Sequence, residues 1–289
     1  MRSRMMGHGS ALGGLLGLAL IAGCSTKPAG LPSQQPIYEV YAVRYAMLPG
    51  YPTRELIAGA DTSRRTDVAM FVWLLKGPGQ RAVLVDAGFY REEFIRAAQP
   101  ADFQRPSDAL DSLGVSPASV TDIIISHVHW DHLGGADLFP NARAWIQRAE
   151  YEYYVGANGE AVHDAIQPVD AAMLARLRAA GRVMLVEGDA QEIVPGIRVY
   201  TGGRHTYASQ YAAVSTRAGT VVIASDNVYL YENLDRHMPI GTTLDPAANL
   251  AAQDRMGTLA SEKRLIIPGH DPEVFERFAG TREGVVRID

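Results

Sequence analysis

Three histidines and one aspartate fall within six consecutive positions, in the segment His127–His132 (H-V-H-W-D-H). Imidazole nitrogens suit zinc and other late divalent metals, and a carboxylate completes such a site. On a loop, His127 and His129 can turn their rings toward one point, while Asp131 and His132 face a second point nearby. A polar loop satisfied by its own hydrogen bonds does not require so many ligand-type side chains. The segment therefore predicts a metal centre.

The elements that must position this cluster follow from the pattern of apolar residues. Residues 121–126 form a short apolar run with the length of a buried strand, which leads directly into the histidines. Strand-like and helix-like segments alternate along the chain, which favours a layered α/β fold. The predicted strands occupy residues 38–45, 67–76, 81–86, 121–126, 142–147, 183–186, 197–201, 221–224 and 265–267, and the predicted helices occupy residues 91–99, 107–113 and 171–180.

The N-terminal segment has the composition of a targeting sequence. Arg2 and Arg4 precede an apolar stretch over residues 11–22, which is too short to span a bilayer comfortably. Residues 1–23 are therefore predicted to be a signal peptide. Residues 24–36 are rich in proline, serine and glutamine and predict a flexible tether. No further linker follows, so we expect one catalytic domain over residues 37–289.

Cys24 is the only cysteine in the chain, so no intramolecular disulfide and no thiolate metal ligand can form within the domain. The segment Ile21-Ala-Gly-Cys24 resembles the lipobox of bacterial lipoproteins. The resemblance implies cleavage before Cys24, lipidation of this cysteine and membrane anchoring in the cell envelope. Ser25 favours the outer membrane. An ordinary secretory signal with an incidental cysteine is the alternative.

Composition excludes one class of partner. The formal net charge is −5 at pH 7, and the chain contains no block of basic residues. Proteins that grip phosphate backbones are usually basic, so we expect a small-molecule substrate and no nucleic acid. The oligomeric state is left open.

The segment Ser126-His-Val-His-Trp-Asp-His-Leu-Gly-Gly135 resembles the signature of the metallo-β-lactamase superfamily. This resemblance implies a four-layer αββα sandwich with two divalent metal ions, most simply zinc, at one edge. It also requires further ligands after later strands. His205, Asp226 and His270 follow the predicted strands 197–201, 221–224 and 265–267 in the expected order.

The resemblance also implies how the ligands divide between the two metals. His127, His129 and His205 would bind the first metal, and Asp131, His132 and His270 the second, with Asp226 bridging both. Asp131 would also relay a proton as a catalytic residue. Asp86 is interpreted either as a support for the ligands or as a simple turn carboxylate. His163 and His237 are given no role.

Three segments resemble N-acyl homoserine lactonases in particular. They are the D-x-x-Y-x-x-E-N stretch from Asp226 to Asn233, the Q-R-x-E-Y-E stretch from Gln147 to Glu152, and the P-G-H-D stretch from Pro268 to Asp271. In that family the tyrosine, here Tyr229, hydrogen-bonds the lactone carbonyl. The resemblance therefore implies lactone ring opening, a quorum-quenching activity. A core or rim tyrosine is the plain alternative for Tyr229.

The sequence departs from these lactonases at the third-ligand loop. That family commonly has T-P-G-H-x-P-G-H-Q, whereas Gly202 to Gln210 reads G-G-R-H-T-Y-A-S-Q, so only His205 and Gln210 stay in register. The departure puts the shape of the pocket in question. Residues 152–180 are also long enough to form a lid or an interface. Trp130 and five tyrosines are candidates for an acyl-chain pocket or for plain core packing, namely Tyr151, Tyr153, Tyr154, Tyr207 and Tyr211.

Competing interpretations remain within and outside hydrolases. A β-lactamase with an Asp/His/His second metal site is one, and a thioesterase similar to glyoxalase II is another. A metal-binding scaffold without activity is a third. A serine hydrolase is not expected, because the chain contains no G-x-S-x-G motif.

Overall fold

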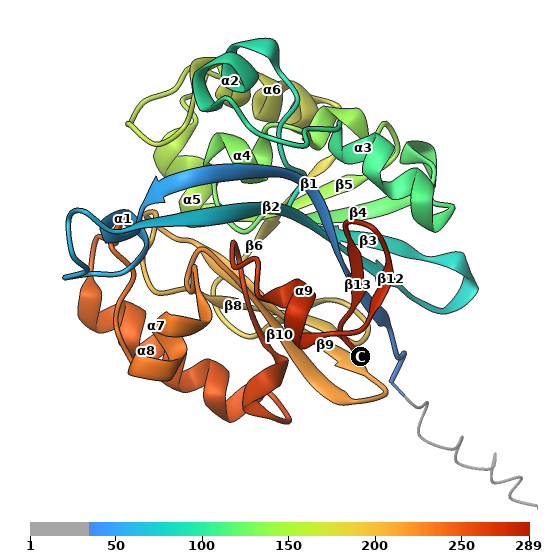
Figure 1. Ribbon diagram of the computed structural model, residues 1–289. Coiled ribbons are helices and arrows are strands. Elements are labelled where there is room, and N and C mark those ends of the chain that lie inside the picture. The colour runs from blue at the N-terminus through green and yellow to red at the C-terminus, as the bar shows by residue number, and fades with distance from the viewer. Residues whose placement is uncertain (1–34) are drawn as a thin grey trace, which may run out of the picture. The chain divides into compact units, whose positions relative to one another are not determined.

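The computed structural model describes residues 35–289 (Figure 1). The predicted signal peptide, Cys24 and the tether up to residue 34 lie outside the described residues. No helix within residues 35–289 is both long and apolar enough to cross a membrane.

Two β-sheets form the centre of the described domain. The larger has eight strands in the order β12-β13-β1-β2-β3-β4-β5-β6, and the run from β3 to β6 is parallel. The smaller has five strands in the order β11-β10-β9-β8-β7, and only its β10–β11 pair is parallel. The strands of the larger sheet are β1 (Glu39–Pro52), β2 (Arg65–Lys76), β3 (Ala82–Val85), β4 (Val120–Ile124), β5 (Arg143–Gln147), β6 (Val183–Val186), β12 (Gly280–Arg282) and β13 (Val285–Arg287). Those of the smaller sheet are β7 (Gln191–Val194), β8 (Ile197–Thr201), β9 (Gln210–Thr216), β10 (Gly219–Ser225) and β11 (Ile266–Pro268).

Helices cover the outer face of each sheet. Figure 1 shows α2 to α6 over the larger sheet, and α7 and α8 beside the smaller one. The helices are α1 (Thr53–Leu56), α2 (Glu92–Ala98), α3 (Pro106–Ala109), α4 (Trp130–Leu133), α5 (Arg148–Tyr154), α6 (Pro168–Ala179), α7 (Tyr231–Arg236), α8 (Pro246–Leu259) and α9 (Val274–Arg277).

Three apolar clusters correspond to the three interfaces between these four layers. Because successive strand residues face opposite sides of a sheet, β3 sends Leu84 into the cluster beneath the helices and Val83 into the cluster between the sheets. The third cluster joins the smaller sheet to α8 through Tyr211 and Met256. Strands buried on both faces explain the nearly continuous apolar runs in the sequence.

Two expectations about secondary structure need correction. The predicted helix at 107–113 is the short helix α3 followed by a 3₁₀ turn, Leu110–Leu113, which ends at Gly114 with φ 69°. Residues 152–180, expected to form a lid or an interface, include a helix that belongs to the core rather than to a lid. Their helix α6 buries Met173, Leu174 and Leu177 against the larger sheet.

The strand ends bring the predicted ligands to one edge of the sandwich. Residues 127–132 follow β4, His205 follows β8, and Asp226 and His270 follow the adjacent parallel strands β10 and β11. Gly269 allows that last approach, because a Cβ atom there would lie 2.7 Å from the backbone carbon of Ser225.

Candidate active site

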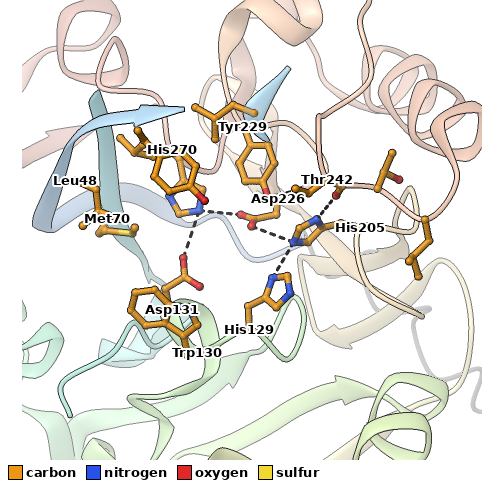
Figure 2. A pocket seen from close by; sticks show the side chains of 15 residues that line it. Leu48, Met70, His129, Trp130, Asp131, His205, Asp226, Tyr229, Thr242 and His270 are labelled. Carbon is orange, nitrogen blue, oxygen red and sulfur yellow. Dashed lines mark hydrogen bonds and ion pairs between the residues drawn. The ribbon is translucent and has the colours of Figure 1, made fainter. Parts of the chain in front are cut away.

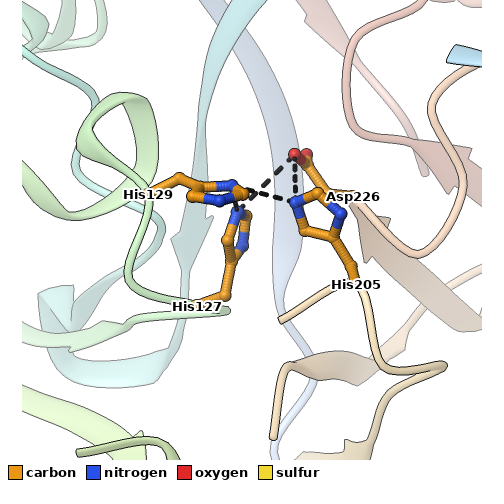
Figure 3. Close-up of side chains that lie close together, drawn as sticks. All are labelled: His127, His129, His205 and Asp226. Carbon is orange, nitrogen blue, oxygen red and sulfur yellow. Dashed lines mark hydrogen bonds and ion pairs between the residues drawn. The ribbon is translucent and has the colours of Figure 1, made fainter. Parts of the chain in front are cut away.

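The first ligand group consists of His127, His129, His205 and Asp226, whose donor atoms all lie within 4.8 Å of one another (Figure 3). His129 Nδ1 lies 2.9 Å from both His127 Nε2 and His205 Nε2. Asp226 Oδ2 is 3.3 Å from His205 Nε2 and 3.6 Å from His127 Nε2. Three imidazoles and a carboxylate therefore converge from three separate segments of the chain.

The second ligand group consists of Asp131, His132 and His270. Asp131 Oδ2 lies 3.4 Å from His132 Nε2 and 3.8 Å from His270 Nε2. The Oδ1 atom of Asp226 lies 3.1 Å from His132 Nε2 and 2.9 Å from His270 Nε2. Asp226 thus places one carboxylate oxygen toward each group, as the predicted bridging position requires.

The tautomers of the imidazoles leave their inner nitrogens free to bind a cation. His205 Nδ1 lies 2.8 Å from the carbonyl oxygen of Thr242, and His270 Nδ1 lies 3.0 Å from that of Ala69. A carbonyl can only accept, so both Nδ1 atoms carry the hydrogen and, in the neutral rings, both Nε2 atoms present a lone pair to the centre. Asp226 Oδ1 is buried and makes no hydrogen bond among the described residues.

The electrostatics of the two groups are also those of a cation site. Burial, followed by the nearby His132, lowers the pKa of His127 well below its ordinary value, and burial followed by His205 lowers that of His129 to about 3. Burial would also lower the pKa of His132, but the carboxylates of Asp226, Asp131 and Asp86 raise it well above its ordinary value. Neutral imidazoles in the first group, and carboxylates that attract positive charge around His132 in the second, are a donor set that fits two divalent metal ions.

Asp86 supports the second ligand group through its contact with His132. This fully buried carboxylate accepts hydrogen bonds from Ser126 N, Ser126 Oγ and Ser225 Oγ and lies 2.8 Å from His132 Nδ1. A carboxylate on Nδ1 fixes the tautomer of an imidazole and increases its basicity as a ligand. Of the two interpretations of Asp86, the geometry favours the support for a ligand.

Tyr229 lies between the two groups, with its ring 5.7 Å from the rings of both His205 and His270 (Figure 2). Its hydroxyl is 2.8 Å from Thr242 Oγ1. Burial, followed by the Asp226 carboxylate, raises the pKa of the phenol well above its ordinary value. Tyr229 is therefore protonated at neutral pH and can donate a hydrogen bond within the site.

A cavity of about 490 Å³ opens over both groups. Besides the ligands, its polar lining includes Tyr229 and Thr242, and Trp130 lies beside Asp131 (Figure 2). The apolar lining consists of Leu48, Leu56, Val68, Met70, Trp130 and Leu244.

The aromatic residues suggested for an acyl-chain pocket divide into two sets. Trp130 lines the cavity, whereas Tyr211 is buried between the smaller sheet and α8, stacked on Tyr200. The remaining four tyrosines do not line the cavity; Tyr153 and Tyr207 stack on each other beside α5. His163 stacks on Tyr153, and His237 pairs with Asp254 at the surface.

The structure places all seven predicted ligands in the two groups and also adds a residue that the sequence did not single out. Thr242 accepts from His205 through its carbonyl and meets the Tyr229 hydroxyl through its own side chain. No local pattern marks this threonine, because its partners lie 37 and 13 residues away in sequence.

The pattern of the metallo-β-lactamase superfamily matches residues 65–270, and the chain belongs to this superfamily. The chain is 32% identical over 167 residues to the N-acyl homoserine lactonase AiiA of Bacillus thuringiensis subsp. kurstaki. That match covers 57% of this chain and 61% of the relative, so the chain spans about 61% of the length of the curated relatives it matches first.

Two solved structures support the fold. A quorum-quenching N-acyl homoserine lactone lactonase aligns with a TM-score of 0.70 and 24% identity over 85% of this chain and 97% of its own. AidC, described as a dizinc quorum-quenching lactonase in complex with a product, aligns with a TM-score of 0.65 and 16% identity over 88% and 95%. The predicted αββα sandwich is confirmed.

Proposed function

We propose that this protein is a metal-dependent hydrolase that opens the ring of N-acyl homoserine lactones. The observation that carries the proposal is a protonated tyrosine, Tyr229, that lines the same cavity as both ligand groups, together with apolar side chains such as Leu48 and Met70. The names of the curated relatives support the same activity.

His127, His129 and His205 would hold one divalent ion and Asp131, His132 and His270 the other, with Asp226 shared between them. Ions bound there make water available as a nucleophile at neutral pH and stabilise negative charge on a carbonyl oxygen. Zinc is the metal we propose, because five imidazoles and two carboxylates suit it. The metal content of the purified protein tests this choice.

Tyr229 would orient the substrate and stabilise charge. Its phenol can turn from Thr242 Oγ1 to donate a hydrogen bond to the lactone carbonyl oxygen, and that bond strengthens as the oxygen becomes negative. The carbonyl carbon gains an oxygen from water, and the ring C–O bond breaks to release the alcohol.

Asp131 would move the proton that this reaction transfers. Its carboxylate lines the cavity and is ionised, because His132 and His270 lower its pKa although burial opposes them. It can take a proton from the attacking water and deliver it to the leaving alkoxide, which becomes the hydroxyl of the ring-opened acid.

The test is hydrolysis of homoserine lactones with a series of acyl chains by the full chain in detergent, with metal content measured alongside. Tyr229→Phe is expected to lower kcat by about 100- to 1,000-fold, the range for removing one oxyanion donor. Tyr211→Phe is the matched control, because its buried hydroxyl makes no hydrogen bond among residues 35–289.

The competing interpretations make different predictions in the same experiment. Turnover of a chromogenic β-lactam without lactone turnover indicates a β-lactamase, and turnover of a glutathione thioester indicates a thioesterase. Two bound metals with no turnover of any ester, thioester or lactam indicate a metal-binding scaffold and contradict the proposal.

We also propose that Cys24 carries a lipid that anchors the enzyme in the cell envelope, at the outer membrane. The sequence Ile21-Ala-Gly-Cys24 supports this location. Labelled palmitate should enter the wild-type protein and not the Cys24→Ser variant. Equal membrane association of the two proteins would contradict the anchor.

A further inference from the structure

Helix α5 contains a buried carboxylate that has no cationic partner in the described part of the chain. Glu150 is fully buried, yet it forms no ion pair with an arginine or lysine among residues 35–289. Its Oε1 accepts from Val128 N at 3.2 Å and from Thr206 Oγ1 at 2.5 Å, and its Oε2 accepts from Ala208 N at 2.6 Å. All three donors belong to the two loops that carry the first ligand group.

These hydrogen bonds join segments that are distant in sequence. Val128 lies between His127 and His129, and Thr206 directly follows His205. One carboxylate therefore fixes the separation of the two loops that bring the three imidazoles of the first group together. We infer that Glu150 is a positioning residue that pre-assembles this group for metal binding.

The burial of Glu150 has an energetic cost, which its hydrogen bonds to the two loops offset. Burial raises the pKa of its carboxyl even though three donors favour the ionised form. An apolar residue could fill the same space, but it would leave the buried N–H group of Val128 and the partly buried N–H group of Ala208 without this acceptor. The carboxylate satisfies both and aligns the loops at the same time.

The outer side of the same loop also depends on α5. Tyr207 stacks on Tyr153 with ring centroids 3.9 Å apart and an angle of 1°, and its backbone N–H donates to Tyr154 Oη at 3.3 Å. His163 stacks on Tyr153 at 4.0 Å. Where related lactonases have proline, glycine and histidine after the third ligand, this chain has Tyr207, Ala208 and Ser209. The stack and the hydrogen bond hold the outer side of this loop against α5.

The inference rests on the proposed function only in that the first group binds a metal. The experiment is therefore a titration of the metal-free full chain in detergent with Zn²⁺, in competition with a chromophoric chelator. A parallel titration with Co²⁺ reports the coordination of each site by its absorption spectrum. Thermal unfolding of the metal-free protein gives the stability separately.

Glu150→Gln is expected to lower the affinity of one of the two sites by about 10- to 100-fold, the usual effect of losing a group that supports metal ligands. The altered Co²⁺ spectrum should be that of the imidazole-rich site, and the other site should keep its affinity. Glu152→Gln is the matched control, because this exposed glutamate lies on the same helix and pairs only with Arg148.

If Glu150→Gln does not fold, Thr206→Val tests the same hydrogen-bonded connection. It removes one of the three hydrogen bonds and should weaken the same site by a smaller factor, whereas Thr206→Ser should match the wild type. Unchanged affinity in the folded variants would overturn the inference. An equal loss of metal affinity at both sites, in proportion to the loss of stability, would also overturn the inference. Absent lactone turnover with normal metal binding would contradict only the proposed function.

Discussion

The two ligand groups share Asp226 but are supported in different ways. In the second group, Asp86 lies directly against the imidazole of His132, at 2.8 Å. In the first group, Glu150 makes no hydrogen bond to an imidazole among residues 35–289. It accepts instead from the backbone of Val128 and Ala208 and from the side chain of Thr206. One carboxylate orients a ligand, and the other orients the segments that carry ligands.

This difference predicts how each group responds to change. The second group is built on a cluster of Asp86, Ser126 and Ser225, which lie at or just after the ends of β3, β4 and β10 and so join the two sheets. The first depends on a loop, residues 202–209, that connects β8 to β9. We therefore expect the first metal to be the one whose affinity depends on contacts outside the sheets.

The largest effect should follow from removing what the groups share. Asp226→Ala deletes one carboxylate oxygen from each group, so both metals should bind more weakly and lactone turnover should fall by roughly 1,000-fold or more. Metal content and kcat/KM measure the two effects. Retention of two tightly bound metals by Asp226→Ala would break the assignment of a shared ligand.

A smaller and selective effect is expected at the second group. Asp86→Asn replaces an acceptor of His132 Nδ1 with a neutral amide, which should weaken the metal of the second group by about 10- to 100-fold. The first group should be affected less, because Asp86 is linked to it indirectly, through Ser126 Oγ, which lies 2.9 Å from His127 Nδ1. Metal titration of the purified variant measures this loss. Asp122→Asn is the control, since this buried aspartate on β4 pairs with Arg143 and Trp145 away from the cavity. An equal loss in both variants would mean that Asp86 acts through stability alone.

Asp170 is a buried carboxylate outside the active site, and it differs from Asp86 and Glu150 in making no hydrogen bond to the ligand loops within residues 35–289. It pairs with Arg91, but its Oδ2 makes no hydrogen bond among the described residues, and burial raises its pKa to about 6. Between about pH 4 and pH 6, the folded protein keeps the proton on Asp170, whereas the unfolded chain has released it. The stability that protonation contributes is therefore present below about pH 4 and is lost as the pH rises through about 6.

The prediction from Asp170 is a change in the pH dependence of unfolding with no change in metal binding. From pH 4 to pH 7, the unfolding free energy of the wild type should fall relative to Asp170→Asn by on the order of 1–3 kcal/mol. Denaturant unfolding of the metal-free proteins across this range measures the difference. Asp164→Asn, at an exposed position, should follow the wild type. A parallel pH dependence in wild type and Asp170→Asn would contradict the raised pKa.

The smallest effect is expected at the rim of the first group. Tyr207→Leu removes the stack on Tyr153 and should weaken the first metal by about 2- to 10-fold, because such aromatic pairs contribute about 0.5–1.5 kcal/mol. Tyr207→Phe keeps the stack and should bind as the wild type does. The zinc titration described for Glu150 measures both. If the two substitutions weaken binding equally, the stack does not position His205.

Much of the fold and part of the ligand set could be predicted, because they depend on short segments of the sequence. The apolar run at 121–126 gave β4, and the histidines directly after it gave most of the site. Boundaries were less predictable. β1 continues to Pro52 rather than ending at residue 45, because its pairing with β2 carries it past two irregularities in register, and no apolar pattern marks them.

From the sequence, local patterns predicted a layered α/β fold and a metal centre at residues 127–132, because ligand types at a strand end are a local signal. The resemblance of residues 126–135 to the metallo-β-lactamase signature implied the αββα class and the remaining ligands, His205, Asp226 and His270. The residues that support these ligands could be identified only in the tertiary structure. Asp86 lies 46 residues from His132, Glu150 lies 56 residues from Thr206, and Thr242 lies 37 residues from His205. Hydrogen bonds between segments so far apart leave no periodicity in the chain. They exist only after the two sheets have packed and brought the loops to one edge.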